Sequence, residues 1–303
     1  MSILVVGSVA FDTVKTPAGE VTDALGGSAA HFSVAASFFT PVRLVAVVGE
    51  DFTAGHRQVL LDRKVDLAGL TTAQGRTFRW SGAYGEDLNN AQTLETQLNV
   101  FAEFRPDVPA AWRDTPLLFL ANIDPELQSE VLDQVRGAKL VAADTMNYWI
   151  AGKPEALKKL LGRIDILLIN DGEIRQLTAE RNVVRAAEAV RRLGPGAVVV
   201  KRGEHGVLVF HGGGTFALPA MPLARVTDPT GAGDAFAGGF LGYLASQPSE
   251  GEHDLRRAAV MGSVMASFQV EDFSHDRLKR LTQPEIRERY EEFTELTRFG
   301  PLS

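Results

Sequence analysis

The 303-residue sequence is 45% hydrophobic, which fits one large α/β domain with a substantial core over residues 1–303. Its formal net charge of −7 argues against broad binding to nucleic acid or to a membrane, since both need a basic protein surface. It has no cysteine, which excludes disulfides, thiolate nucleophiles and Cys-based zinc sites and favours a reducing cytoplasm as its location.

The first 104 residues predict alternating strands and helices, followed by a segment of a different kind. Apolar runs and helical spacing predict a strand over 3–6, a polar loop, a helix over 28–39 with Ser28 as its N-cap, a strand over 42–48 and a helix over 53–64. Between 71 and 104, aromatic, β-branched and polar residues are mixed without a helical period, around candidate strands at 76–84 and 96–104. We expect this segment to form antiparallel strands outside the main sheet.

Regular alternation resumes after residue 116 and implies a parallel sheet covered by helices. The expected strands are 117–121, 140–143, 164–169, 198–200 and 207–210, with a glycine turn at 212–214. The expected helices are 126–136, 154–161, 171–178, 183–193, 234–245, 253–268 and 284–299. Ligands bind beyond the carboxyl ends of parallel strands, which directs attention to the loops 7–12, 170–173 and 228–234.

The most informative segment is 228–236, which reads Asp-Pro-Thr-Gly-Ala-Gly-Asp-Ala-Phe. The amides of Gly231, Ala232 and Gly233 can approach an anion closely, and the helix that begins beside them adds its positive dipole end. Asp234 would then lie where a hydroxyl group meets a phosphate, in the position of a general base. Alternatively, Asp234 only stabilises the helix dipole, by about 0.5 kcal/mol.

Other candidate residues also have purely structural explanations. Asn170 can cap the helix that contains Glu173 in a capping-box arrangement. Gly203 and Gly206 can form a glycine hairpin between two strands, and Asp12 can close a turn through its side chain. Each explanation leaves room for a functional one.

The segment 228–236 resembles the C-terminal signature of the PfkB, or ribokinase-like, family of sugar and nucleoside kinases. Gly26-Gly27-Ser28 is similar to the family's N-terminal paired glycines, 170–173 to its N-x-x-E motif and 203–206 to its G-x-x-G nucleotide loop, in the family's order. The resemblance implies a three-layer α/β/α fold with a mostly parallel central sheet and a small antiparallel β lid, to which about 13–25 and 71–104 would contribute.

The resemblance also implies a reaction, transfer of the ATP γ-phosphate to a primary hydroxyl group of a nucleoside or sugar. Asp234 is similar to the family's general base, and the amides of Gly231, Ala232 and Gly233 are similar to its anion hole. Residues that would contact the acceptor are Asp12, Gly26, Gly27, Ser28 and His31. His31 stands where many relatives have asparagine, and packing is the favoured explanation for a lone histidine on such a helix.

On the nucleotide side, the resemblance places Asn170 and Glu173 near Mg²⁺, through water. It implies further nucleotide contacts from Lys201, Gly203, Gly206 and Thr230, with Lys201 standing where threonine is common. It also allows activation by K⁺, with Asp228 and the stretch after Phe268 near the expected loop.

The acceptor that we expect is a nucleoside, because 26–28 and the arrangement from Ala259 through Phe293 resemble the adenosine and nucleoside kinase branch. The alternative acceptors are ribose and a keto-sugar acid. A different class of function is a ligand-binding regulator without catalysis on the same fold. The lid could bury its outer face in a homodimer, and we expect neither nucleic acid nor a membrane as a partner.

Overall fold

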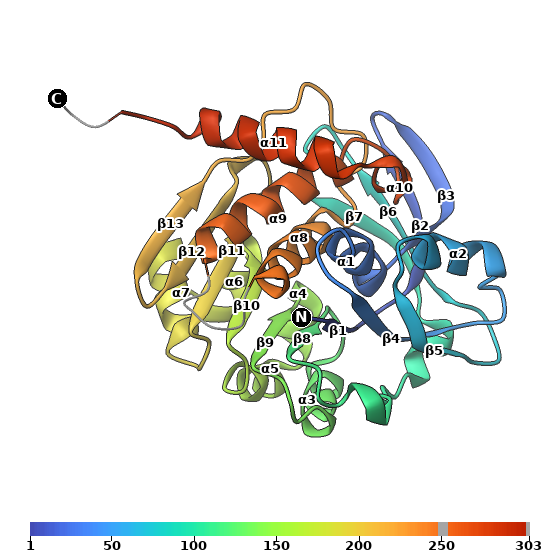
Figure 1. Ribbon diagram of the computed structural model, residues 1–303. Helices are drawn as coiled ribbons and strands as arrows, with labels where there is room; N and C mark the ends of the chain where they lie inside the picture. Colours follow the sequence, from blue (N-terminus) through green and yellow to red (C-terminus); the bar gives the residue numbers. More distant parts are fainter. Residues whose placement is uncertain (248–253, 301–303) are drawn as a thin grey trace.

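Nine strands form a large sheet in the part of the chain that the computed structural model describes, residues 1–247 and 254–300 (Figure 1). Their order across the sheet is β13 (Gly214–Leu218), β12 (Val207–His211), β11 (Ala197–Lys201), β10 (Ile166–Asn170), β9 (Leu140–Asp144), β8 (Leu117–Leu120), β1 (Ile3–Val6), β4 (Val42–Val48) and β5 (Asp66–Thr72). All neighbouring pairs from β11 to β5 are parallel, and only the pairs at the β13 edge are antiparallel. The expected mostly parallel sheet is therefore confirmed.

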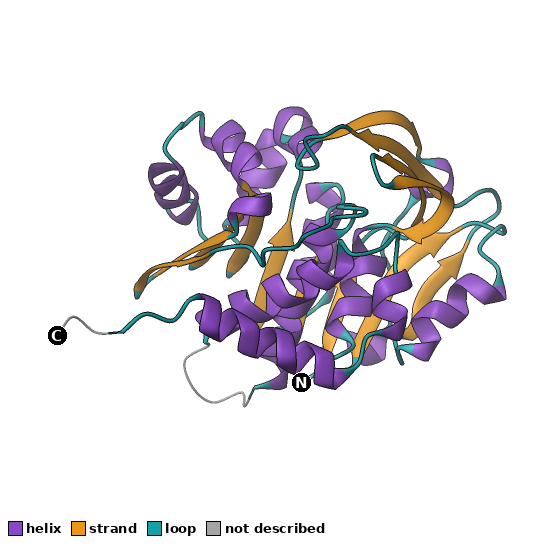
Figure 2. Ribbon diagram, turned by 90° about the horizontal axis from the view of Figure 1, so that it is seen from above, coloured by secondary structure: helices purple, strands orange, loops and turns teal. Residues whose placement is uncertain are grey.

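Helices cover both faces of this sheet and enclose two hydrophobic cores (Figure 2). β1 shows the division, because Ile3 and Val5 belong to one core and Leu4 and Val6 to the other. The first core contains residues of α1 (Ser28–Ala36), α2 (Ala54–Asp62), α8 (Ala232–Ser246), α9 (Leu255–Gln269), α10 (Asp276–Arg280) and α11 (Gln283–Leu296). The second contains residues of α3 (Pro125–Gln134), α4 (Asn147–Gly152), α5 (Pro154–Leu161), α6 (Asp171–Thr178) and α7 (Val183–Arg191).

A second, smaller sheet has the strand order β3 (Gly19–Gly26), β2 (Ala10–Thr16), β6 (Phe78–Tyr84) and β7 (Ala91–Gln97). The β2–β3 and β6–β7 pairs are antiparallel, as expected, and the central β2–β6 pair is parallel. Because β2 begins shortly after β1 ends, this sheet is attached at the carboxyl end of β1. Short 3₁₀ helices lie at η1 (Asn99–Glu103), η2 (Ala110–Trp112) and η3 (Gly203–His205).

Several predicted elements are wrong in detail. The polar loop after the first strand is the β2–β3 hairpin, and the strand expected over 96–104 ends at Gln97 and continues as η1. Thr71 and Thr72, expected outside the main sheet, pair with Val47 and Val48 inside it. α4, α10 and β5 were not predicted. The helix expected from residue 253 is α9, which begins at Leu255, while position 253 lies outside the described residues.

No helix in the described ranges is both long and apolar enough to span a bilayer.

Candidate active site

Polar side chains stand at the carboxyl ends of three neighbouring strands. β9 ends at Asp144, β10 at Asn170 and β11 at Lys201, and Asn170 pairs in register with Lys201. Lys201 Nζ lies 2.7 Å from Asp144 Oδ2. A Cβ atom placed on Gly233 would lie 3.1 Å from the same Nζ, so the absent side chain of Gly233 makes room for the ammonium group at the start of α8. The sheet edge and the helix therefore meet at Lys201.

Asp234 lies in the first turn of α8, as its motif predicts. The helix begins at Gly231, whose φ of 75° is in the left-handed region that glycine adopts without strain. Burial, reinforced by the charge of Asp144, raises the pKa of Asp234 to about 7, while the charges of His31 and Lys201 act in the opposite direction. A carboxyl group with this pKa can accept a proton near neutral pH.

His31 packs against the start of this helix from α1. A Cβ on Gly231 would lie 2.5 Å from the His31 ring, so only glycine leaves space for the imidazole. His31 Nε2 is 3.8 Å from Asp12 Oδ2, and the ring centroid is 4.4 Å from that of the buried His275. Burial would lower the pKa of His31, but the carboxylates of Asp12, Asp234 and Asp228 together raise it. The His31 ring therefore lies among acidic side chains, and the charges of Asp12, Asp228 and Asp234 all act on it.

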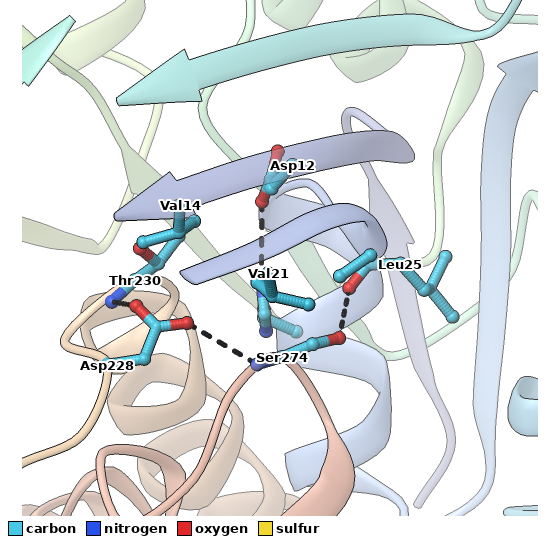
Figure 3. A pocket seen from close by; sticks show the side chains of 9 residues that line it. Asp12, Val14, Val21, Leu25, Asp228, Thr230 and Ser274 are labelled. Atoms are coloured by element: carbon cyan, nitrogen blue, oxygen red, sulfur yellow. Dashed lines mark hydrogen bonds and ion pairs between the residues drawn. The ribbon is translucent and has the colours of Figure 1, made fainter. Parts of the chain in front are cut away.

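A small pocket lies between the small sheet and the start of α8 (Figure 3). Asp12 stands on β2, so it belongs to the small sheet rather than to the loop in which we expected it. No lysine or arginine is among the lining residues, which are Asp12, Val14, Val21, Ala24, Leu25, His31, Asp228, Thr230 and Ser274. The pocket is therefore acidic and half apolar.

The paired glycines position Asp12 and the start of α1. A Cβ on Gly26 would overlap Asp12 Oδ2 at 1.9 Å, and one on Gly27 would lie 2.6 Å from the carbonyl oxygen of Ser8. Gly27, with a φ of 91°, is the N-cap of α1, so the assignment of the N-cap to Ser28 is wrong. Ser28 is the first helical residue, and its backbone N–H donates to the Ser8 hydroxyl (3.0 Å). Any larger side chain at Gly26 would displace the Asp12 carboxylate.

Asn170 and Glu173 form the capping box that their spacing allows. Asn170 Oδ1 accepts from the Glu173 N–H (2.7 Å), and Glu173 Oε2 accepts from the Asn170 N–H (2.9 Å). Burial and the charge of Asp144 raise the pKa of Glu173 to about 7, opposed by Lys201. Among the described residues, no three acidic, imidazole or thiol groups gather as a metal cluster. Mg²⁺ is commonly bound by only one or two carboxylates together with the phosphates of a nucleotide. Glu173 and its neighbours can supply these carboxylates.

The glycine loop after β11 contacts the small sheet. Gly203, the first residue of η3, and Gly206, which follows η3 in the β11–β12 hairpin, have φ of 54° and 83°. The Glu204 N–H donates to Asn89 Oδ1 (3.4 Å), and Asn89 Nδ2 donates to Glu204 Oε1 (3.3 Å). A Cβ on Gly203 would lie 2.0 Å from Asn89 Oδ1. The loop 203–206 and the turn after β6 are therefore in contact through Gly203, Glu204 and the side-chain amide of Asn89.

Asp228 and Thr230 lie on the pocket side. Asp228 is buried, and its carboxylate accepts from the backbone N–H groups of Thr230 (2.8 Å) and Ser274 (3.4 Å). The Thr230 hydroxyl lies 3.4 Å from the hydroxyl of Tyr84 on β6. The buried Gln269 side chain donates through Nε2 to the carbonyl oxygens of Thr230 (3.2 Å) and Ser274 (2.6 Å). This amide links the two loops around Asp228.

Sequence reasoning missed Asp144 and Gln269. Asp144 directly follows the apolar run 140–143, so the rule that selected Asn170, a polar residue at the end of a buried strand, could have found it. Gln269 gives no such signal, because it lies near the end of a long helix and far in sequence from the loop that it binds.

Curated relatives cover most of the chain. A cytidine kinase from Thermococcus kodakarensis is 31% identical over 82% of this chain and 91% of its own length. A nucleoside kinase from Methanothermobacter thermautotrophicus is 26% identical over 89% of each chain. A 2-dehydro-3-deoxygluconokinase from Thermoproteus tenax is 32% identical over 46% of this chain and 38% of its own length.

Solved structures share the fold. A Burkholderia thailandensis nucleoside kinase in complex with inosine has a TM-score of 0.81 and is 19% identical, over 97% of this chain and 99% of that chain. A protein from E. coli solved with ATP and Mg²⁺ has a TM-score of 0.77 and is 18% identical, over 97% and 99% of the two chains. The three-layer ribokinase-like fold is thereby confirmed.

The family model described as pfkB family carbohydrate kinase matches residues 2–277, a range that includes both sheets and every residue of the candidate site. The chain is a phosphotransferase that acts on a hydroxyl group, and it belongs to the pfkB family of carbohydrate kinases.

Proposed function

We propose that this protein transfers the γ-phosphate of ATP to a primary hydroxyl group of a nucleoside. The observation that carries the proposal is the position of Asp234 in the first turn of α8, where the neighbouring Gly231 adjoins His31 and Gly233 adjoins Lys201. The acceptor oxygen attacks the γ-phosphorus and the bond to ADP breaks, while the hydroxyl proton passes to Asp234. The backbone N–H groups of Gly231 and Gly233 would stabilise the negative charge that develops on the phosphoryl oxygens. The N–H of Ala232, the third member of the expected anion hole, donates to the carbonyl oxygen of Pro229 (3.1 Å).

Asp12, His31 and the glycines 26–27 would hold the acceptor. The Asp12 carboxylate can accept hydrogen bonds from sugar hydroxyl groups, and the absent Cβ of Gly26 leaves it in place. The buried ring nitrogens of His31 have no hydrogen-bond partner among the described residues, and Nε2 lies 3.8 Å from Asp12 Oδ2, so a small movement would let the imidazole bond to a ligand. These contacts supply the alignment on which phosphoryl transfer depends.

Asn170, Glu173, Lys201, Gly203 and Gly206 would bind the nucleotide. Bound Mg²⁺ supplies charge neutralisation at the phosphates, and Glu173 is the side chain that would hold it through water. The positive φ angles of Gly203 and Gly206 let the backbone of this loop approach a ligand closely. Thr230 lies in the pocket, and we assign it to the acceptor side.

We further propose that the small sheet closes over the acceptor as a lid. Asp12, Val14, Val21 and Leu25 of β2 and β3 line the pocket, and Tyr84 of β6 reaches Thr230. A lid excludes water, which would otherwise compete as acceptor. Contact between two lids in a homodimer stays a prediction, and sedimentation velocity tests it.

Oxygen atoms around Asp228 could serve as ligands of K⁺. The carbonyl oxygens of Thr230 and Ser274 each accept one hydrogen bond from Gln269, and the Asp228 carboxylate accepts from two backbone N–H groups. Each of these oxygens keeps a lone pair for a cation. Activation by K⁺ stays a prediction, which a potassium titration tests.

The acceptor alternatives differ in charge. A keto-sugar acid carries a carboxylate, whereas the pocket contains Asp12 and Asp228 and no lysine or arginine. Repulsion between like charges disfavours this acceptor. A nucleoside is neutral, so it does not meet this repulsion. The cytidine kinase match, which extends over most of both chains, supports the same choice.

The test measures ADP formation from Mg-ATP with nucleosides, ribose and 2-dehydro-3-deoxygluconate as acceptors. We expect cytidine or another nucleoside to give the highest kcat/KM, and Asp234→Asn to lower kcat by about 10²–10⁴-fold. The absence of acceptor-dependent ADP formation across the whole panel would favour a ligand-binding regulator. Full turnover by Asp234→Asn would show that another group takes the proton.

A further inference from the structure

The Asp144–Lys201 ion pair is built into the protein more firmly than a surface pair. The two side chains are only 6% and 17% exposed, and Lys201 Nζ is 2.7 Å from Asp144 Oδ2. The Thr145 N–H donates to the other carboxylate oxygen, Oδ1 (2.7 Å), and Gln128 Nε2 donates to the Asp144 backbone carbonyl (3.1 Å). Contacts to both carboxylate oxygens fix the direction in which Asp144 presents its charge.

A buried ion pair seldom stabilises a fold, because removing both charges from water offsets their attraction. An apolar pair of similar volume could fill the same space. The location of this pair, at the carboxyl edge of the sheet and against α8, instead suggests a role in chemistry. Charged groups that are buried at functional sites are frequently retained for what they do to a ligand.

The ammonium group lies where the phosphoryl group would be transferred. Its Nζ fills the space that a Gly233 side chain would take, and Asp234 is the next residue in the chain. The lysine Nζ thus lies beside the first turn of α8, the end of the helix that attracts anions. An anion held at this helix start would meet the ammonium group as well.

We propose that Lys201 is a further catalytic residue, whose ammonium group contacts the phosphoryl group during transfer, and that Asp144 is the positioning residue that holds it there. The inference rests on the proposed function. As the acceptor oxygen–phosphorus bond forms and the phosphorus–oxygen bond to ADP breaks, negative charge spreads over the peripheral phosphoryl oxygens. Lys201 keeps its own proton and neutralises this charge, while the acceptor proton goes to Asp234.

Measurements of ligand binding and of turnover distinguish a contact between Lys201 and the transferred phosphoryl group from a general attraction between Lys201 and a nucleotide. Lys201 adjoins Gly233, so it touches the γ-phosphoryl group, which ADP lacks. We expect Lys201→Met to lower kcat by about 100-fold, the usual loss for one oxyanion donor. Its Kd for ADP should change by less than about 3-fold, whereas its Kd for a non-hydrolysable ATP analogue should rise about 10-fold. Equal weakening of both ligands, or an unchanged kcat, would overturn the proposal.

The pH profile gives a second readout. The charges of Lys201 and Asp144 act on Asp234 in opposite directions, so Lys201→Met should move the acid limb of kcat/KM to higher pH and Asp144→Asn should move it to lower pH. Asp144→Asn should also lower kcat, by about 10-fold, because the ammonium group loses its anchor. Lys201→Arg keeps the charge and should keep the acid limb unmoved. Shifts of the same sign in both charge-removing variants would contradict the assignment.

Removing Lys201 alone leaves Asp144 buried without its partner, which can unfold the protein. The double variant Lys201→Met/Asp144→Asn removes both charges and restores neutrality. It should recover the melting temperature and keep the low kcat of Lys201→Met. Recovery of wild-type kcat would show that the pair is structural.

Arg163→Met is the control for loss of one cation. Arg163 Nη2 lies 2.7 Å from Asp133 Oδ1, an ion pair of the same length on the protein surface outside the candidate site. This variant should keep kcat, both Kd values and the acid limb. The proposed function and this inference can also fail separately. An active Asp234→Asn refutes the former, whereas an inactive Asp234→Asn with a fully active Lys201→Met refutes only the latter.

Discussion

Asp234→Asn should stabilise the folded protein while it abolishes turnover. The substitution keeps the shape of the side chain and removes a carboxylate whose pKa is raised from 3.8 to about 7. That difference is about three pKa units, equivalent to about 4 kcal/mol at 1.36 kcal/mol per unit. Because the side chain is partly exposed and interacts with Lys201, we expect a gain of roughly 2–4 kcal/mol above neutral pH. A carboxylate that only stabilised a helix dipole would give the opposite sign, a loss of about 0.5 kcal/mol.

The gain should depend on pH in a defined direction. Between the unfolded pKa of 3.8 and the folded pKa of about 7, folding retains the proton, so the wild-type protein loses stability as pH rises through this window. The difference between variant and wild type should therefore grow by roughly 1–3 kcal/mol from about pH 5 to about pH 8.

Urea unfolding at both pH values measures this difference. Asp276→Asn is the control, because Asp276 is also in the first turn of a helix but is 55% exposed and paired with Lys279. It should change stability by less than about 0.5 kcal/mol at either pH. A destabilised Asp234→Asn at pH 8 would refute the reasoning, since it would assign Asp234 the role that Asp276 has.

Three further predictions concern pH, backbone and cation dependence. kcat/KM should rise with pH to a plateau above about 7, because the base Asp234 loses its proton. The variant Glu173→Gln should leave this acid limb in place. Loss of the limb would instead assign it to the titration of Glu173. Gly231→Ala should cost roughly 3 kcal/mol in urea unfolding, because φ is 75° and the new Cβ meets the His31 ring, whereas Gly212→Ala, with open space around it, should be nearly neutral; equal effects would contradict the packing argument. Replacing K⁺ by choline should lower kcat, because the Asp228 carboxylate and the carbonyl oxygens of Thr230 and Ser274 keep lone pairs for a cation; an unchanged kcat would remove the cation site.

The buried layers of the fold could be predicted from the sequence, and the lid could be predicted only in part. Strands such as β1 and β10 are continuous apolar runs because both of their faces are covered. β3 and β7 have mostly exposed or half-exposed residues, so their sequences carry no hydrophobic alternation and resemble loops. Pairing with β2 and β6, which no local pattern records, makes them strands.

The same distinction applies to the site. Asp234 and the capping box of Asn170 and Glu173 are local in sequence, and the structure places them as their spacing predicts. The Asp144–Lys201 pair joins residues 57 positions apart, and its partners meet only because β9 and β11 both flank β10. Contacts of this kind depend on the order of the strands in the sheet, which no local sequence pattern predicts.

The contact between Asn89 and the Gly203 loop has a mechanical consequence. The turn that carries Asn89 belongs to the sheet over the acceptor pocket, while Gly203 follows the strand that ends at Lys201. The proposed opening of the small sheet would break the two hydrogen bonds between Asn89 and Glu204. A ligand that orders the glycine loop would therefore favour the closed position, so that binding of one substrate would promote enclosure of the other.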